Sequence, residues 1–488
     1  MIWRDLRTRY ARFAERVSTR RLIATLAIVF VLGSVPLLSL WQVAQSTGNE
    51  VRAIENVAYL APSPVTALLS ARRVPQTLVD QVTSSRLTRK LNQLTTLLPP
   101  DSCLVVTTDG RIVYQLRPNL SLIPASTMKL LTAAVALDVL GAQTTYITRL
   151  KGIVVGSEVR GDLWLVGSGD PLLSTRLYPI GEKYPTLFPT YVETLVDALV
   201  AKGITMIQGG VIGDDSLYDR ERYSPTWGDG LRSVEVGPIG ALMINDATIL
   251  GTPLMPANPA YAAAAEFSRL LNERGIFVKD PPDVGIASSD TPLIASLESA
   301  PIKNIVGEML TNSDNNTAEL LLKDIGRVAR GSATRIDGLQ AVAEKVTQWG
   351  LPTQGVVLSD GSGLDRANRV TCSLLTSVLE QAGQNSDLVL GMAIAGSTGT
   401  LRDVFLSGPG YGVMRAKTGT LNGVKALSGL FPMGDAHASV FTLILNGPGT
   451  STVSYYRPIW NGLVTALATG AETIDVSLVE PLTARSAP

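Results

Sequence analysis

Histidine is almost absent from this chain of 488 residues: His437 is the only one. Its scarcity excludes every mechanism and every metal site that needs two histidine side chains. Cysteine is also scarce, since Cys103 and Cys372 are the only two and stand too far apart for a zinc knuckle. They can pair if the chain is exported, but the sequence does not show whether they lie close together. No metal or cofactor is indicated.

An excess of charge of either sign is absent as well. Lys and Arg together number 42, and Asp and Glu together also number 42, so the net charge is zero. Nothing in this balance indicates nucleic acid as a partner. Hydrophobic residues make up 45% of the chain and charged residues only 17%. This composition fits a globular protein with large cores and an additional apolar segment.

The apolar segment is a run without charge over residues 22–44. Seven arginines precede it against two acidic residues, which predicts a cytoplasmic segment over 1–21 followed by a single membrane-spanning anchor. The alternative is a signal peptide, whose apolar core is normally only about 7–15 residues long. The run is longer than that, and it ends in Trp41-Gln42-Val43-Ala44, a poor cleavage site. We therefore expect a retained anchor, with the rest of the chain outside the cytoplasm at the cell membrane.

The remaining sequence divides by its secondary-structure signals. We expect a spacer over 45–94, with a short helix over 88–98 at its end. Two β-rich runs flank Asp109-Gly110 and predict a hairpin over 103–115. Short strands and turns dominate 151–289, which predicts an inserted module. Helices and then consecutive antiparallel strands follow over 290–470, before a polar tail over 471–488. We expect 95–150 and 290–470 to form one domain, whose sheet contains both the hairpin and the strand around Lys417.

A lysine stands where it is not expected, in the apolar segment over 124–141. Pro124 near its start and Gly141 at its end predict a helix. Ser126 and Lys129 are three positions apart, so they share one face of that helix. Lys129 is the only lysine in the chain with a serine three positions before it. Alone, this spacing is weak evidence, because a lysine in an apolar helix usually extends its ammonium group to solvent.

Two further motifs change the interpretation. Ser313-Asp314-Asn315 lies in a polar loop before a predicted helix, and Lys417-Thr418-Gly419 lies in a predicted strand. Ser-x-x-Lys, Ser-Asp-Asn and Lys-Thr-Gly, in this order, are typical of penicillin-binding proteins and class A β-lactamases. A serine nucleophile needs an adjacent base, and burial lowers the pKa of a lysine towards the range in which it can accept a proton. We expect Lys417 to supply a second cation that lowers the pKa of Lys129 further.

The chain resembles the low-molecular-mass class C penicillin-binding proteins, the D-alanyl-D-alanine carboxypeptidase/endopeptidase family. Ser313 follows Ser126 by 187 positions (313 minus 126), whereas compact β-lactamases have a much shorter interval. The stretches GSGDPLLS, GVIGDDSLYD, LSDGSGLDR and AGSTGTLRD also resemble family segments, and the resemblance covers about residues 72–468. The chain departs from the family in its N-terminal anchor and in a shorter insertion. The resemblance implies an α/β (α+β) fold of the serine DD-peptidase and β-lactamase type.

The resemblance also implies roles for individual residues. Ser126 would be acylated by a peptidoglycan stem peptide or a β-lactam, and Lys129 would take its proton. Ser313 would relay a proton to the departing D-alanine, and Asn315 would hold Lys129 and the substrate amide. The backbone N–H groups of Ser126 and Thr420 would bind the oxyanion. The substrate-binding residues would be Lys417, Thr418, Gly419, Thr420, Leu421 and Arg366; Lys417 and Thr418 would bind the terminal carboxylate, while Arg366 and Leu421 would face a stem-peptide side chain.

Other polar residues have two interpretations. Asp360-Gly361-Ser362-Gly363 reads as a tight turn or as a loop that approaches the site. Asp170 favours a structural role, and the paired carboxylates Asp214 and Asp215 follow Gly213 and read as a turn at a strand end.

Two other functions remain open from sequence. A serine β-lactamase would use the same acylation groups, but no convincing Glu-x-x-x-Asn segment stands between the first two motifs. A non-hydrolytic protein that binds or senses peptidoglycan is the alternative from another functional class.

Overall fold

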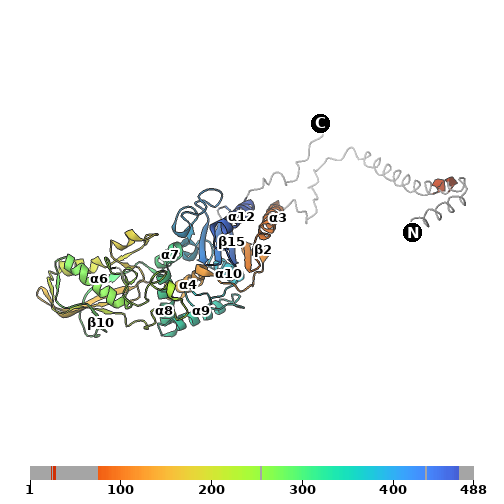
Figure 1. Ribbon diagram of the computed structural model, residues 1–488. Coiled ribbons are helices and arrows are strands. Elements are labelled where there is room, and N and C mark those ends of the chain that lie inside the picture. Colours follow the sequence, from red (N-terminus) through yellow and green to blue (C-terminus); the bar gives the residue numbers. More distant parts are fainter. Residues whose placement is uncertain (1–22, 25, 29–74, 253–254, 435–436, 472–488) are drawn as a thin grey trace, which may run out of the picture. The chain divides into compact units, whose positions relative to one another are not determined.

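The computed structural model describes residues 23–24, 26–28, 75–252, 255–434 and 437–471 (Figure 1). The chain divides into two compact units, 1–73 and 74–488, and the fold below is that of the second. Within the described ranges, no helix has both the length and the apolar character required to cross a membrane. The predicted anchor over 22–44 lies almost entirely outside these ranges, as do the basic segment 1–21 and the polar tail beyond residue 471.

A six-stranded sheet carries the Lys-Thr-Gly motif, and every neighbouring pair of its strands is antiparallel. The predicted hairpin and the strand around Lys417 lie in this one sheet, as expected. Asp109 and Gly110 both have positive φ, +50° and +75°, as a two-residue turn between tightly paired strands requires. The strand order is β12 (Ala393–Ile394), β13 (Arg415–Leu421), β14 (Val424–Pro432), β15 (Ala438–Asn446), β1 (Ser102–Thr108) and β2 (Arg111–Leu116).

Both faces of this sheet are buried, so its central strands are apolar on both sides rather than alternating. In β15, Ile444 packs into one core and its neighbours Leu443 and Leu445 into the other. The first core is closed by the helices α4 (Lys129–Ala136), α7 (Ile302–Asn312), α8 (Asn315–Arg330), α9 (Arg335–Gln348), α10 (Cys372–Ala382) and α11 (Asp387–Leu390). The second core is closed by α3 (Pro75–Thr95) and α12 (Val453–Ala471), which contact each other.

Helix α3 corrects the expectation of a spacer that ends in a short helix over 88–98. The helix begins at Pro75, a residue favoured in the first turn because its missing N–H is not needed there. Leu87, Leu91 and Leu94 are spaced by four and three positions, which places them on one face, and all three are buried in the core beside α12. The residues between these three leucines are mostly polar, so the sequence pattern did not indicate the full length of the helix.

Residues 147–298 contribute a second, seven-stranded sheet with its own core. Its main path runs β10 (Asp283–Val284), β8 (Val211–Asp214), β4 (Glu158–Val166), β3 (Ile147–Val155) and β11 (Leu293–Glu298). Off this path, β7 (Met206–Ile207) pairs with β4, and β9 (Phe277–Val278) pairs with β7. The helices α5 (Glu193–Ala201) and α6 (Pro259–Glu273) pack on it. Two short strands, β5 (Leu173–Ser174) and β6 (Thr190–Tyr191), form a separate parallel pair.

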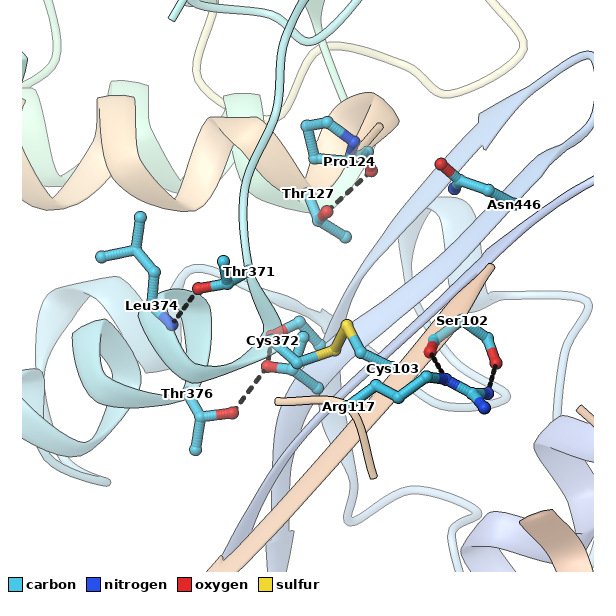
Figure 2. The surroundings of a disulfide bond; sticks show 12 residues. Ser102, Cys103, Arg117, Pro124, Thr127, Thr371, Cys372, Leu374, Thr376 and Asn446 are labelled. Atoms are coloured by element: carbon cyan, nitrogen blue, oxygen red, sulfur yellow. Dashed lines mark hydrogen bonds between the residues drawn. A yellow bond between two sulfur atoms is a disulfide. The ribbon is translucent and has the colours of Figure 1, made fainter. Parts of the chain in front are cut away.

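A disulfide joins Cys103 in β1 to Cys372, the first residue of α10, with an S–S distance of 2.07 Å (Figure 2). Thr371 caps the same helix by accepting a hydrogen bond from the Leu374 backbone N–H at 3.1 Å. The pairing that the sequence leaves open is therefore present. It ties the six-stranded sheet covalently to the helical layer on one of its faces.

Candidate active site

Ser126 lies in a 3-10 turn, Ala125–Met128, which leads directly into α4. Ala125 has a φ of +48°, an uncommon conformation for a residue with a side chain. Two glycines allow other segments to approach this turn. A Cβ on Gly363 would lie 2.0 Å from the Ala125 carbonyl oxygen, and a Cβ on Gly419 would lie 2.6 Å from the Pro124 carbonyl oxygen. The glycine of the Lys-Thr-Gly motif is thus required by close packing against the turn that carries Ser126.

Lys129 is fully buried, one turn beyond Ser126. Its Nζ donates to Asn315 Oδ1 at 2.7 Å and to the Ser362 carbonyl at 2.7 Å, and lies 3.3 Å from Ser126 Oγ. Burial lowers the pKa of Lys129 from 10.5 to about 8, although the carboxylates of Asp360, Glu319, Asp314 and Glu235 oppose that change. The lysine is therefore close to the range in which it can act as a base at neutral pH.

The three contacts match the hydrogen-bonding capacity of a neutral amine. A neutral lysine amine has two N–H donors and one lone pair. Asn315 Oδ1 and the Ser362 carbonyl accept the two donors, which leaves the lone pair for the hydroxyl of Ser126. A protonated lysine would instead direct its third N–H at Ser126 and could not accept a proton from it.

Lys417 and Ser313 form the second polar pair of the site. Ser313 ends α7 in a left-handed conformation with a φ of +68°, and its Oγ accepts a hydrogen bond from Lys417 Nζ at 2.8 Å. Lys417 is fully buried, and its pKa is lowered well below the usual value by burial and then by repulsion from Lys129 and Lys425. The lowered pKa of Lys129 is thus caused by burial rather than by the second cation that the sequence predicts at Lys417.

Asn315 opens α8, after the N-cap residue Asp314, whose carboxylate accepts from the Thr317 backbone N–H at 3.2 Å. The Asn315 amide is engaged at both ends, because its Nδ2 donates to the Glu235 carbonyl at 2.6 Å. A substrate amide would have to replace or share this second contact.

Strand β13 forms one wall of the site. Gly419 packs against the serine turn, and Thr418 is mostly buried while Thr420 is exposed. Arg366 is exposed and donates from Nη1 to the carbonyl of Asn422 at 2.8 Å, directly after Leu421. The structure thus brings the two residues predicted to face a stem-peptide side chain to the same rim.

The comparisons with known proteins agree with this geometry. Residues 101–253 and 250–458 match the model of the D-Ala-D-Ala carboxypeptidase 3 (S13) family. The chain belongs to this family. It is 29% identical over 431 residues to a D-alanyl-D-alanine carboxypeptidase of Actinomadura sp. (strain R39), covering 70% of this chain and 77% of that protein. It is 30% identical over 356 residues to a carboxypeptidase of Mycobacterium tuberculosis, covering 70% and 74%.

A solved structure supports the fold of this S13 carboxypeptidase. Penicillin-binding protein 4 of Haemophilus influenzae superposes with a TM-score of 0.63 at 23% identity, covering 76% of this chain and 99% of that one. The predicted resemblance to class C penicillin-binding proteins, the mixed α/β fold and the antiparallel sheet are confirmed.

The structure of this S13 carboxypeptidase decides between the site role and the structural role of the polar residues for which the sequence allowed both. The loop over 360–363 approaches the site, because its Ser362 carbonyl accepts from Lys129. Asp170 and Asp214 have structural roles: each accepts a backbone N–H two residues ahead in its own turn, from Leu172 and Ser216 respectively. Asp215 forms an ion pair with Arg222 at 2.6 Å.

Sequence reasoning missed two side chains that adjoin the motifs. Glu319 is four positions after Asn315 on α8, so it shares the face that points at Lys129, and this spacing is a signal that was available. Lys425 pairs across the sheet with Thr420 and donates to its Oγ1 at 2.8 Å. It lies 4.0 Å from the centroid of the Tyr456 ring, and burial lowers its pKa to about 8. No sequence motif marks Lys425.

Proposed function

We propose that this serine-type D-Ala-D-Ala carboxypeptidase acts on peptidoglycan stem peptides through an acyl-enzyme on Ser126. One observation carries the proposal. The buried amine of Lys129 is 3.3 Å from Ser126 Oγ, and its two other hydrogen-bonding directions are occupied by Asn315 Oδ1 and the Ser362 carbonyl. This arrangement suits a general base whose lone pair faces the nucleophile.

Acylation then proceeds as follows. Neutral Lys129 takes the proton of the Ser126 hydroxyl as Oγ attacks the carbonyl carbon between the two D-alanines. The resulting oxyanion is bound by the backbone N–H groups of Ser126 and Thr420. The proton that Lys129 has taken is relayed through the Ser313 hydroxyl to the departing nitrogen, so Lys129 is neutral again as the C–N bond breaks and D-alanine leaves. A water molecule then gives up a proton to Lys129 and attacks the ester, and that proton returns to Ser126 Oγ as the shortened peptide is released.

Substrate recognition is assigned to the two walls of the site. The terminal carboxylate binds the Lys417 ammonium group and the Thr418 hydroxyl. Burial disfavours the protonated form of Lys417 in the free enzyme. The carboxylate of the bound substrate is an anion that favours this protonated form again. Arg366 and Leu421 contact a stem-peptide side chain. β-Lactams acylate Ser126 through the same groups.

Endopeptidase action on cross-linked peptides is a second candidate. A cavity of about 460 Å³ adjoins Ser313 and Asn315, and its lining includes Glu235 and Asp246. Cavities of roughly 300–1,000 Å³ hold drug-sized ligands, whereas D-alanine has only six non-hydrogen atoms. Space beside the serine that protonates the leaving group favours a larger leaving peptide.

Membrane attachment and compartment are further parts of the proposal. We propose that residues 22–44 anchor the chain, that residues 1–21 are cytoplasmic, and that the catalytic domain (95–150 and 290–470) with its inserted module (151–289) lies outside. The arginine-rich segment before the apolar run supports this orientation. The disulfide between Cys103 and Cys372 supports an oxidising compartment.

The test is labelling with fluorescent penicillin, followed by intact-mass measurement. The parent and a Ser121→Ala control should gain one penicilloyl group, whereas Ser126→Ala should gain none. Parent-level labelling of Ser126→Ala would overturn the assignment of the nucleophile. Release of D-alanine from a pentapeptide, and of monomers from a cross-linked muropeptide, separates carboxypeptidase from endopeptidase action. Hydrolysis of a chromogenic cephalosporin at many turnovers per second would favour a β-lactamase instead, and acylation without peptide hydrolysis would favour a sensor.

A further inference from the structure

The Ser362 carbonyl, which accepts from Lys129, belongs to a loop that is held from outside. Glu319 on α8 contacts this loop, and Glu319 and Ser362 are both buried. Glu319 Oε1 accepts two consecutive backbone N–H groups, from Gly361 at 3.1 Å and from Ser362 at 2.8 Å. The Ser362 N–H belongs to the peptide group next to the one that carries the carbonyl, so only the φ and ψ of Ser362 lie between this contact and the carbonyl.

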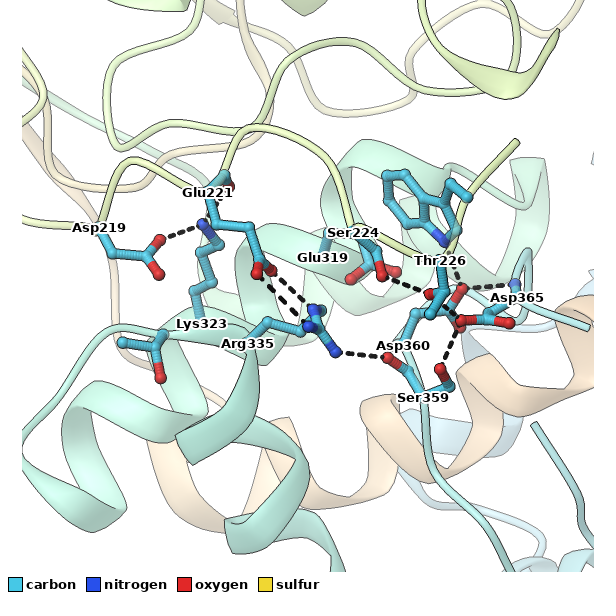
Figure 3. Close-up of polar contacts among 12 residues, drawn as sticks. Asp219, Glu221, Ser224, Thr226, Glu319, Lys323, Arg335, Ser359, Asp360 and Asp365 are labelled. Atoms are coloured by element: carbon cyan, nitrogen blue, oxygen red, sulfur yellow. Dashed lines mark hydrogen bonds and ion pairs between the residues drawn. The ribbon is translucent and has the colours of Figure 1, made fainter. Parts of the chain in front are cut away.

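The same loop is held on its other side by its own carboxylate. Asp360 accepts from the Gly363 N–H at 2.7 Å, the Asp365 N–H at 2.6 Å and Trp227 Nε1 at 2.9 Å. Arg335 also donates to the carbonyl of Ser359 at 2.9 Å (Figure 3). The Gly363 N–H is in the same planar peptide group as the Ser362 carbonyl, so Asp360 holds that group directly. Glu319 holds the two peptide groups that precede it.

Glu319 and Asn315 act from the same helix. They are separated by four positions on α8, so their side chains lie one above the other on one face. Asn315 contacts Lys129 directly through Oδ1, and Glu319 contacts it through the Ser362 residue. One helix face therefore controls both acceptors that orient the amine of Lys129.

We propose that Glu319 is a positioning residue for the general base: it holds the Ser362 carbonyl on Lys129 Nζ, so that the lone pair of the neutral amine faces Ser126. This inference rests on the proposed role of Lys129 as the base. It assigns to Glu319 no contact with substrate. Its effect is on the geometry of the amine and on the charge that surrounds it.

Charge gives Glu319 a second effect that can be measured separately. The carboxylates of Asp360, Glu319, Asp314 and Glu235 favour the protonated form of Lys129, and the Lys417 amine faces it across the site. Burial and the nearby Asp360 raise the pKa of Glu319 itself to about 8. As Glu319 ionises, its negative charge therefore holds the proton on Lys129, so removing that charge should allow Lys129 to act at lower pH.

Two substitutions separate position from charge. Glu319→Gln keeps an oxygen that accepts both N–H groups but removes the negative charge. Its plateau rate of penicillin acylation should stay within a few-fold of the parent, and the alkaline rise of that rate should move to lower pH by about one unit. Glu319→Leu removes the acceptor, so its plateau rate should fall at least about tenfold, which corresponds to about 1.4 kcal/mol.

The matched control is Glu193→Gln on α5, another buried carboxyl that accepts a backbone N–H, from Arg176 at 2.8 Å. It should leave the pH profile of acylation in place. Acylation is followed by mass spectrometry from pH 5 to 10, with thermal unfolding of each variant. If Glu319→Leu fails to fold, the plateau rate of Glu319→Asp tests the position instead, because its carboxylate is one methylene group shorter and cannot reach both N–H groups.

The outcomes distinguish this inference from the proposed function. A Glu319→Leu plateau equal to the parent's overturns the positioning role, and a Glu319→Gln profile that coincides with the parent's overturns the effect of charge. Both results leave Lys129 as the base. Acylation that persists in Ser126→Ala, or a parent rate that does not rise with pH, would instead refute the proposed mechanism itself.

Discussion

Replacing Lys129 by methionine should change how stability depends on pH. The pKa of this lysine is about 8 in the folded protein and about 10.5 when unfolded. Because the folded pKa is the lower one, burial of the charged form costs stability at every pH below about 8. That cost disappears as the pH rises towards 10.5. Methionine has nearly the same shape but does not titrate, so the variant lacks this dependence.

The magnitude follows from the two pKa values. Between pH 7 and pH 10, the parent should gain about 2.5 kcal/mol of unfolding free energy relative to Lys129→Met. The variant also leaves two acceptors without a donor, Asn315 Oδ1 and the Ser362 carbonyl. That penalty is nearly independent of pH and cancels when the difference between the proteins is compared at two pH values. Coupling to Lys417 broadens the transition but has the same sign, since both buried lysines bind protons less tightly when folded.

Urea unfolding of both proteins at pH 7, 8, 9 and 10 measures this difference, and acylation is measured in parallel. About a tenth of Lys129 should be neutral at pH 7, compared with about one part in 3,000 at the usual pKa. The parent's acylation rate should therefore rise with an apparent pKa near 8. Lys129→Arg should be almost inactive because guanidinium does not deprotonate in this range, while Lys345→Arg on α9 serves as the control. A stability difference that stays constant with pH, or near-parent acylation by Lys129→Arg, would refute the reasoning.

Three further predictions concern other parts of the site. Gly363→Ala should abolish acylation although it changes no polar side chain, because its Cβ would lie 2.0 Å from the Ala125 carbonyl oxygen. The control Gly412→Ala, also at positive φ but with open space around it, should still be acylated. Cys103→Ser should lower the unfolding free energy by roughly 2–5 kcal/mol in chemical denaturation, and a reductant should affect only the parent. Lys425→Met removes a buried cation that lowers the pKa of Lys417. Lys417 should therefore stay protonated at higher pH in the variant, and the pH at which KM for a D-Ala-D-Ala peptide begins to rise should be higher than in the parent.

The parts of the site that were predictable are those in which chemistry restricts residue type. A serine nucleophile beside a lysine, and a lysine followed by a small residue on a strand, leave recognisable spacings in the sequence. The hairpin at Asp109-Gly110 was predictable for a similar reason, since few residues accept positive φ in a two-residue turn.

The parts that were not predictable depend on backbone groups and on distant packing. Any residue offers a carbonyl, so nothing in the sequence marks Ser362 as the second acceptor for Lys129. The extent of α3 was missed because its buried residues Leu87, Leu91 and Leu94 pack in a core that α12 closes from the other end of the chain. The sequence also does not show that burial, rather than Lys417, is the main cause of the lowered pKa of Lys129.

The pairing of β1 with β15 has a consequence for the time at which this protein becomes active during its synthesis. Ser102 lies opposite Leu445 in that ladder, whereas the second sheet is built entirely from residues 147–298. A nascent chain can therefore complete the second sheet while β1 still has no partner on its β15 side. Ser126 and Lys129 are made early, but the strand that packs its glycine against their turn comes some 290 residues later (419 minus 126 is 293). A nascent chain that still lacks β13 lacks one wall of the site, so the capacity to react with a β-lactam should arise only late in synthesis.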